Sequence, residues 1–148
     1  MRKFIFSVLF ALFSVQAFAQ ITASFDFTVS VKGDYPIDGA GKAVVRNECY
    51  YVNANGFEIF CDGATRWVMD TSAKELTVEN AENWTEMVED YDLRYEGSKV
   101  TGASITLVDG TKVSLVVKNF VDSVPQTAKF SLDVSKLPDD YIVTDLRN

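Results

Sequence analysis

The sequence predicts a mainly β fold, in which an antiparallel sheet curls into an incomplete, half-open β-barrel with a short helical lid. Three features of the chain indicate this fold. One segment alternates strictly between apolar and polar residues, three short loops that end in glycine join apolar segments, and only one stretch has helical spacing. Because so little helix is available to cover an apolar sheet face, we expect the sheet to curve around that face.

The first twenty residues, MRKFIFSVLFALFSVQAFAQ, have the pattern of a cleavable signal peptide. Two basic residues precede an apolar run over 4–15, and an A-x-A cleavage pattern ends at Ala19. The run is shorter than the ~20 residues of a membrane span, although an anchor that stays attached is the alternative. We expect residues 1–19 to be a signal peptide and residues 20–148 to form one exported, soluble domain.

The mature chain is strongly acidic and lacks the residues of common catalytic sites. The signal peptide contains two of the 14 basic residues and none of the 21 acidic ones, which leaves a net charge near −9. This charge argues against nucleic-acid partners and against attachment to anionic lipid. The chain has no histidine, the commonest general base and metal ligand. We expect no enzymatic activity, no catalytic residue, no metal and no cofactor.

The segment 21–32, ITASFDFTVSVK, predicts the first strand. Phe25 and Phe27 fall on one face of the strand, and Asp26 and Thr28 fall on the other, so one face is buried. The glycine-rich stretch 33–41 predicts a turn or loop. Further strands are expected at 42–53, 57–61, 64–70, 75–79, 98–107, 111–120, 127–134 and 141–146.

Three connections share one design, a short loop that ends in glycine. The loops are 54–56, 61–63 and 108–110. If each is a three-residue loop with a left-handed glycine, Phe57 lies opposite both Asn53 and Trp67, and Ile105 lies opposite Val113. Two-residue turns would mix apolar and polar residues on each face, because a slip of one residue inverts every side chain. The apolar pattern therefore favours three-residue loops.

This register predicts a continuous apolar face on the inside of the curled sheet. We expect the lining to be Phe25, Phe27, Val45, Tyr51, Phe57, Ile59, Trp67, Met69, Ile105, Leu107, Val113 and Leu115. Helical spacing over 82–91 predicts a short lid that brings Trp84 and Met87 to the same space. The residues alone leave open whether this interior is a filled core or a ligand cavity.

The chain resembles the LolA-type carrier proteins, which are periplasmic chaperones of outer-membrane lipoproteins. It is especially similar in pattern to the short LolA-like proteins of Bacteroidetes-type bacteria. The matching segments run in order over nearly the whole mature chain. They are ASF at 23–25, DGAG at 38–41, CDGATRW at 61–67, AKFSL at 128–132 and YIVTDLR at 141–147. The family fold is an incomplete antiparallel barrel with a helical lid around an apolar cavity.

The resemblance implies a carrier that shields lipoprotein acyl chains during transfer across the periplasm, between an inner-membrane release complex and an outer-membrane acceptor. We expect a monomer, because nothing in the sequence demands a dimer. The resemblance also implies a basic residue after the second strand that closes the lid. Arg46 is the nearest match, although Asn47 stands where the family has proline. The family usually has a helix before its first strand, and here the expected signal peptide runs almost directly into that strand, so we do not expect this helix. The lid region is reduced to 80–96.

The two cysteines predict a structural disulfide rather than a redox centre or a metal site. In the favoured register Cys49 and Cys61 lie opposite each other across a hairpin, at a spacing that a disulfide accepts. Two free, buried thiols are the alternative, and two sulfurs without histidine do not predict a metal site.

Other functions remain open beside the lipoprotein carrier. The same barrel could carry another lipid, or it could be a filled, non-catalytic interaction or sensor domain that contacts a protein partner in the cell envelope. A third alternative is an extracytoplasmic structural domain without a ligand. Cavity volume and movement of the 82–91 segment separate these alternatives.

Overall fold

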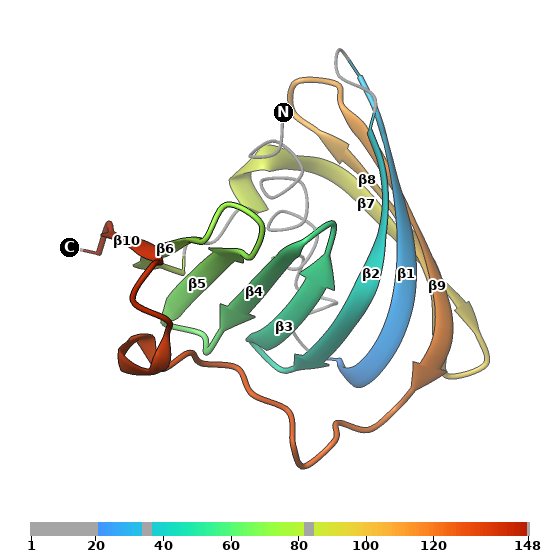
Figure 1. Ribbon diagram of the computed structural model, residues 1–148. Helices are drawn as coiled ribbons and strands as arrows, with labels where there is room; N and C mark the ends of the chain where they lie inside the picture. The colour runs from blue at the N-terminus through green and yellow to red at the C-terminus, as the bar shows by residue number, and fades with distance from the viewer. Residues whose placement is uncertain (1–20, 34–36, 82–84, 148) are drawn as a thin grey trace.

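The computed structural model describes residues 21–33, 37–81 and 85–147. The expected signal peptide and Trp84 lie outside these residues. Ten strands form a single sheet that curves into a half-barrel (Figure 1). The strands are β1 (Thr22–Lys32), β2 (Ile37–Arg46), β3 (Cys49–Ala54), β4 (Phe57–Cys61), β5 (Thr65–Asp70), β6 (Glu75–Asn80), β7 (Val88–Glu96), β8 (Lys99–Leu107), β9 (Lys112–Val121) and β10 (Ile142–Asp145).

The order of strands in the sheet is β10-β6-β5-β4-β3-β2-β1-β9-β8-β7. All neighbours pair antiparallel except β10, which lies parallel to β6. Among the described residues β7 and β10 each pair on one side only, so the sheet is not closed. The predictions of a mainly β fold and of an antiparallel, unclosed sheet are therefore confirmed.

The alternation of β1 places its apolar residues on the concave side of the sheet. Phe25, Phe27, Val29 and Val31 are buried there, whereas Thr28 is exposed on the convex side. Side chains from β2, β3, β4, β8 and β9 join them in one continuous apolar cluster. Burial of this one-sided pattern is the main hydrophobic contribution to the fold.

Gly41 allows β2 to pass close beneath the aromatic side chains of the concave face. It lies opposite Phe27 on β1 and Ala54 on β3. A Cβ atom at this position would come within 2.4 Å of the Asn53 carbonyl oxygen and 2.9 Å of the Phe27 ring. Only glycine fits such an approach. The expected loop over 33–41 is therefore wrong in its second half, because β2 already begins at Ile37.

The first two hairpins differ from the predicted three-residue loops. Asn55 and Gly56 both have positive φ, 54° and 82°, which is the geometry of a two-residue type I′ turn. Phe57 consequently pairs with Ala54 instead of Asn53. The expected strand over 42–53 is also two strands, because the chain reverses at Asn47, whose φ is 56°.

The second loop is longer than predicted and the third agrees with the prediction. The carboxylate of Asp62 accepts hydrogen bonds from the backbone amides of Ala64 and Thr65, which extends the loop before β5. Phe57 therefore does not lie opposite Trp67, which pairs with Phe60. The register predicted for β8 and β9, with Ile105 opposite Val113, is confirmed.

The expected helix over 82–91 is wrong in its described part. A short 3-10 turn, η1, covers Thr85–Met87, and the chain then continues as β7. The register of β7 shifts between Val88 and Asp90, so Val88 and Tyr91 share a face at a spacing of three residues. A bulged strand thereby imitates helical periodicity.

The segment 128–147, here called the C-terminal strap, packs against the convex face of β4–β6. It ends beside β6 (Figure 1). The expected strand over 127–134 is wrong. The strap instead contains a 3-10 turn, η2 (Val134–Lys136), where the Asp133 carboxylate accepts a hydrogen bond from the Ser135 amide. It ends in β10, close to the strand expected at 141–146.

Candidate functional site

Most of the predicted lining residues meet on the concave face, here called the concave wall. They are Phe25, Phe27, Val45, Phe57, Ile59, Ile105, Leu107, Val113 and Leu115. None of them is more than 5 % exposed. Phe25 packs edge-on against Phe27, with centroids 6.5 Å apart, and stacks on Phe120 at 6.2 Å. The wall is therefore apolar, continuous and rich in aromatic rings.

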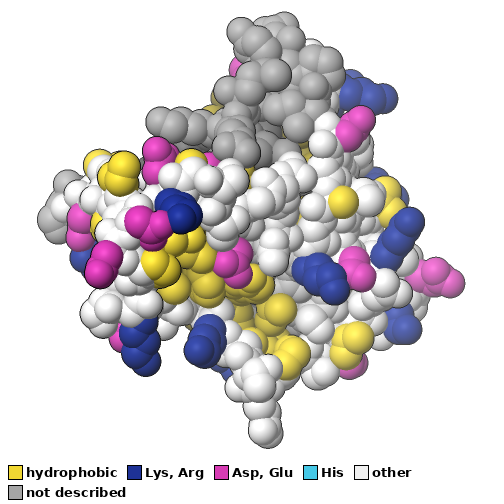
Figure 2. Space-filling view, viewed as in Figure 1, with side chains coloured by type: hydrophobic (Ala, Val, Ile, Leu, Met, Phe, Trp, Pro, Cys, Tyr) yellow, Lys and Arg dark blue, Asp and Glu magenta, His cyan; other side chains and the backbone are white. Residues whose placement is uncertain are grey.

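Three predicted lining residues, Tyr51, Trp67 and Met69, lie on the opposite, convex face. They belong to a second apolar cluster with Phe60, Leu76 and Val78, which packs against Leu132, Leu137 and Tyr141 of the strap. Apolar side chains gather over β3–β5 beside the strap in Figure 2. Their predicted place on the wall is wrong because the first two hairpins have a different register. Met87 is half-buried in η1 and does not belong to a helical lid.

The concave face remains apolar as far as the free edge of the sheet at β7. Tyr91 lies opposite Ile105, and Tyr95 lies opposite Val100, so both tyrosines share the face of the wall. Tyr91 is 49 % exposed and Tyr95 is 56 % exposed. Half-buried Leu93 lies between them along the strand. This edge is the accessible border of the wall.

The concave face is polar where it crosses β5 and β6. Arg66 lies opposite Cys61 on one side and Glu79 on the other. Its side chain is only 2 % exposed, and its Nε atom donates to Glu79 Oε1 at 3.0 Å. Arg66 is absent from the predicted lining, because the predicted register gave its neighbour Trp67 the inward position.

Tyr50 completes this polar group from β3. Its hydroxyl forms hydrogen bonds with Arg66 and Cys61, and burial is the main reason that its pKa lies well above the usual range. Burial also raises the pKa of the Cys61 thiol, which is thereby kept protonated at neutral pH. Tyr50 and Arg66 therefore place a neutral hydroxyl and a cation side by side at the end of the apolar wall.

Arg46, the expected lid-closing residue, lies on the convex side of the sheet. Its guanidinium lies 4.9 Å from the centroid of the Phe130 ring in the strap. This cation–π contact fastens the strap to β2, away from the concave wall.

The expected disulfide between Cys49 and Cys61 is wrong, since both cysteines are free. Cys49 pairs with Arg46, whereas Cys61 pairs with Tyr50. Neighbouring positions on a strand point to opposite faces, so the two thiols lie on different sides of the sheet.

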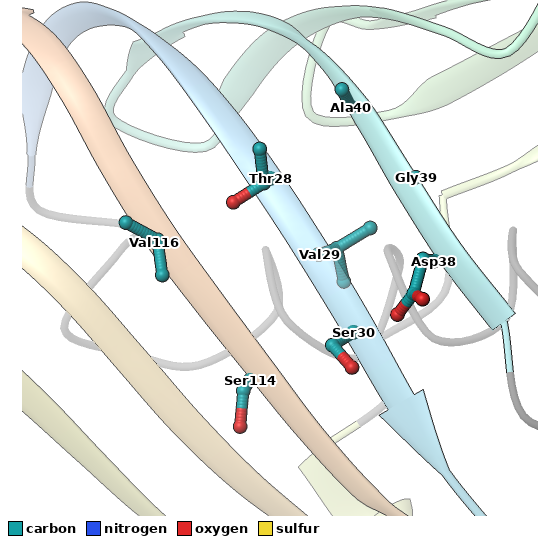
Figure 3. A pocket seen from close by; sticks show the side chains of 8 residues that line it. All are labelled: Thr28, Val29, Ser30, Asp38, Gly39, Ala40, Ser114 and Val116. Atoms are coloured by element: carbon teal, nitrogen blue, oxygen red, sulfur yellow. The ribbon is translucent and has the colours of Figure 1, made fainter.

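A shallow hollow of about 480 Å³ lies on the convex face of β1, β2 and β9. Figure 3 shows the short side chains that border it, from Thr28, Val29, Ser30, Asp38, Gly39, Ala40, Ser114 and Val116. Val29 is the one lining residue among them that also belongs to the concave cluster. Within the described part of the chain, no group of three or more histidine, cysteine or acidic residues could hold a metal ion.

Comparisons with known proteins support the fold. No protein-family model matches the chain, and no curated protein matches it. An uncharacterized conserved protein from Thermus thermophilus, known from its crystal structure, is similar with a TM-score of 0.53. The match covers 94 % of this chain and 96 % of that chain at 10 % sequence identity, so it extends to the fold alone. In the described ranges no helix is long and apolar enough to cross a membrane.

Proposed function

We propose that this protein is an exported, non-catalytic carrier of the LolA type. It holds the acyl chains of lipoproteins against the concave wall and takes them from an inner-membrane release complex to an outer-membrane acceptor. The observation that supports this proposal is the continuous apolar wall in a sheet that is not closed. The resemblance of the sequence to LolA-type carriers supports the same function.

The energetics of an acyl chain require such a shield. Each methylene group removed from water contributes about 0.8 kcal/mol, so a free acyl chain is strongly disfavoured in an aqueous compartment. Phenylalanine rings and branched aliphatic side chains on the wall replace the water around the chain. The negative charge of the protein keeps the carrier itself in solution.

The free edge at β7 is the proposed entrance. The wall residues are buried in the structure described here, so an acyl chain must displace side chains or strands to reach them. Among the residues that the structure describes, β7 pairs with β8 alone, and its concave side carries the exposed rings of Tyr91 and Tyr95. An edge strand moves away at the cost of one ladder of hydrogen bonds, whereas a central strand would break two.

A filled interaction domain is the second candidate function. The nearly complete burial of the wall favours it, because a packed interior leaves no volume for a ligand. The apolar side chains beside the strap in Figure 2 would then offer a surface for a protein partner.

Native mass spectrometry of the mature protein, purified from its own envelope, tests the proposal. We expect a bound acylated protein or lipid, which extraction would identify, and uptake of an added triacylated peptide. Tyr91→Ala and Tyr95→Ala should slow this uptake, while Val108→Ala, an exposed residue in the β8–β9 loop, should not. A mass without ligand, together with no uptake of the peptide, would contradict the carrier and favour the filled domain.

A further inference from the structure

We propose that Arg66 binds the carboxylate head group of a long-chain acyl ligand, in exchange for Glu79. This inference rests on the proposed function, because the same concave wall holds the acyl chain. It assigns a ligand class, the long-chain carboxylates, beyond the acylated lipoproteins.

The position of Arg66 in the sheet is the first argument. One row of directly paired residues crosses the concave face from β1 to β6, and it consists of Ala23, Val45, Tyr50, Cys61, Arg66 and Glu79. The row begins at the apolar wall and becomes polar at β5. A charged group therefore lies at the end of an apolar surface, which is the arrangement that an amphipathic ligand needs.

The unequal exposure of the ion pair is the second argument. Arg66 is 2 % exposed and Glu79 is 28 % exposed. A guanidinium stays charged at every physiological pH, so Arg66 requires an anion wherever it remains buried. The carboxylate of Glu79 can rotate toward the solvent while its strand stays in place, whereas the buried guanidinium of Arg66 cannot. A ligand carboxylate would satisfy the same planar donors.

Tyr50 supplies the third argument. Its hydroxyl forms a hydrogen bond with Arg66, and its raised pKa keeps the hydroxyl protonated at neutral and moderately alkaline pH. A guanidinium can only donate, so the Tyr50 oxygen accepts from Arg66 and the hydroxyl proton is donated to Cys61. Tyr50 therefore holds the guanidinium in place, and the remaining N–H groups of Arg66 are available to a carboxylate. An ester group would gain little from this site, since it has no charge.

The adjacent row of the sheet provides a path for the acyl chain. It runs from Val68 on β5 through Ile59, Val52 and Ala43 to Phe25 on β1. Each of these residues belongs to the concave cluster or packs against it. Four strand spacings of ~4.8 Å give a path of about 19 Å, a length that suits a long-chain fatty acid.

Calorimetric titration with palmitate and with its methyl ester tests this inference, with a triacylated peptide as a third ligand. We expect the protein to bind palmitate about tenfold more tightly than the ester, because one charge-assisted hydrogen bond between Arg66 and the carboxylate increases the affinity by about this factor. Glu79→Gln removes the competing carboxylate, so palmitate should bind more tightly still while the ester is unaffected. Arg66→Met should abolish the preference, whereas Arg94→Met, an exposed arginine of β7, should retain it.

The outcomes separate this inference from the proposed function. Equal affinities for palmitate and the ester, in both the unaltered protein and Glu79→Gln, would overturn the role of Arg66 and leave the carrier intact. Binding of none of the three ligands would overturn both. Glu79→Gln keeps the test decisive even if Arg66→Met does not fold.

Discussion

The two apolar clusters of the protein lie on opposite faces of one sheet, and they are buried in different ways. The concave wall is built by β1–β4, β8 and β9, whose side chains meet inside the curved sheet. The convex cluster lies on β4–β6 and is covered by the C-terminal strap, a segment more distant in the sequence. One cluster is therefore closed by curvature and the other by an added layer.

The change of side takes place at β4. Ile59 and Cys61 face the concave wall, while Phe60 between them faces the strap, so successive residues of this strand are all buried. On β5 and β6 charged residues enter the concave face, as Arg66 and Glu79 show, beside the apolar Val68. The comparison teaches that a single sheet can bury an apolar cluster on each of its faces and still hold charged side chains on the inner one.

Trp67→Ala should produce the largest effect and should affect stability alone. Removal of a buried tryptophan costs about 3–5 kcal/mol of unfolding free energy, which urea denaturation measures. Since Trp67 faces the strap, uptake of the triacylated peptide by the folded fraction should not change. Loss of uptake at unchanged stability would contradict the assignment of the two faces.

Ile59→Ala should reduce both stability and ligand binding, because Ile59 belongs to the concave wall. We expect a loss of about 2–5 kcal/mol of unfolding free energy. The affinity for acyl ligands should fall in the same variant. Ile142→Ala is the matched control, since Ile142 is 64 % exposed on β10, and its effect on either quantity should be below about 0.5 kcal/mol.

Arg46→Ala should loosen the strap without affecting the wall. Loss of the contact between Arg46 and the Phe130 ring should cost about 0.5–2 kcal/mol. Hydrogen exchange should accelerate at the amides of Ile142 and Leu146, which donate to Lys74 and Val78 across the edge of the sheet. Unchanged exchange at these two amides would contradict a role of Arg46 in holding the strap.

A smaller effect is expected at alkaline pH, from Tyr51 in the convex cluster. Burial, together with the hydrogen bond to Glu58, raises the pKa of Tyr51 from 10.0 to about 12. The unfolded chain therefore loses this proton first, so the contribution of Tyr51 to stability is complete below pH 10 and disappears as the pH rises through about 12. Tyr51→Phe should flatten the fall of the urea midpoint with pH. Tyr95→Phe, at an exposed position, should not.

The cysteines provide a test of the register with no expected change in stability. Alkylation under denaturing, non-reducing conditions should label both Cys49 and Cys61, because neither forms a disulfide. In the folded protein Cys61 should react far more slowly than Cys49, since it is buried on the concave face. A protein in which neither cysteine is labelled after denaturation would contradict this register.

The sequence was sufficient for the concave wall and insufficient for the convex cluster. In 21–32 and in the β8–β9 hairpin, the local alternation of apolar and polar residues determines which side chains face the concave side. The positions of Phe25, Ile105 and Leu115 could therefore be predicted. The turn at Asn55-Gly56 fits two loop lengths, and only the complete sheet decides between them. The strap has no strand periodicity, so nothing local indicated that it covers Trp67.

The polar end of the candidate site was missed for the same reason. Arg66 follows a hairpin whose pairing differs from the prediction by three residues, since Phe57 lies opposite Asp70 instead of Trp67. A charged residue is, moreover, ordinarily assigned to the outer face. Its burial depends on Glu79 and Tyr50, which lie on two other strands. Such an arrangement is a property of the assembled sheet and not of any one segment.

The most direct test of the central claim is to locate a bound acyl chain on one of the two faces. Isotope-filtered nuclear Overhauser spectra of the protein with a carbon-13-labelled palmitoyl ligand report contacts between the chain and individual methyl groups. We predict contacts with the methyl groups of Ile59 and Leu115 on the concave wall and none with Leu76 and Val78 beneath the strap. Contacts confined to Leu76 and Val78 would contradict the account.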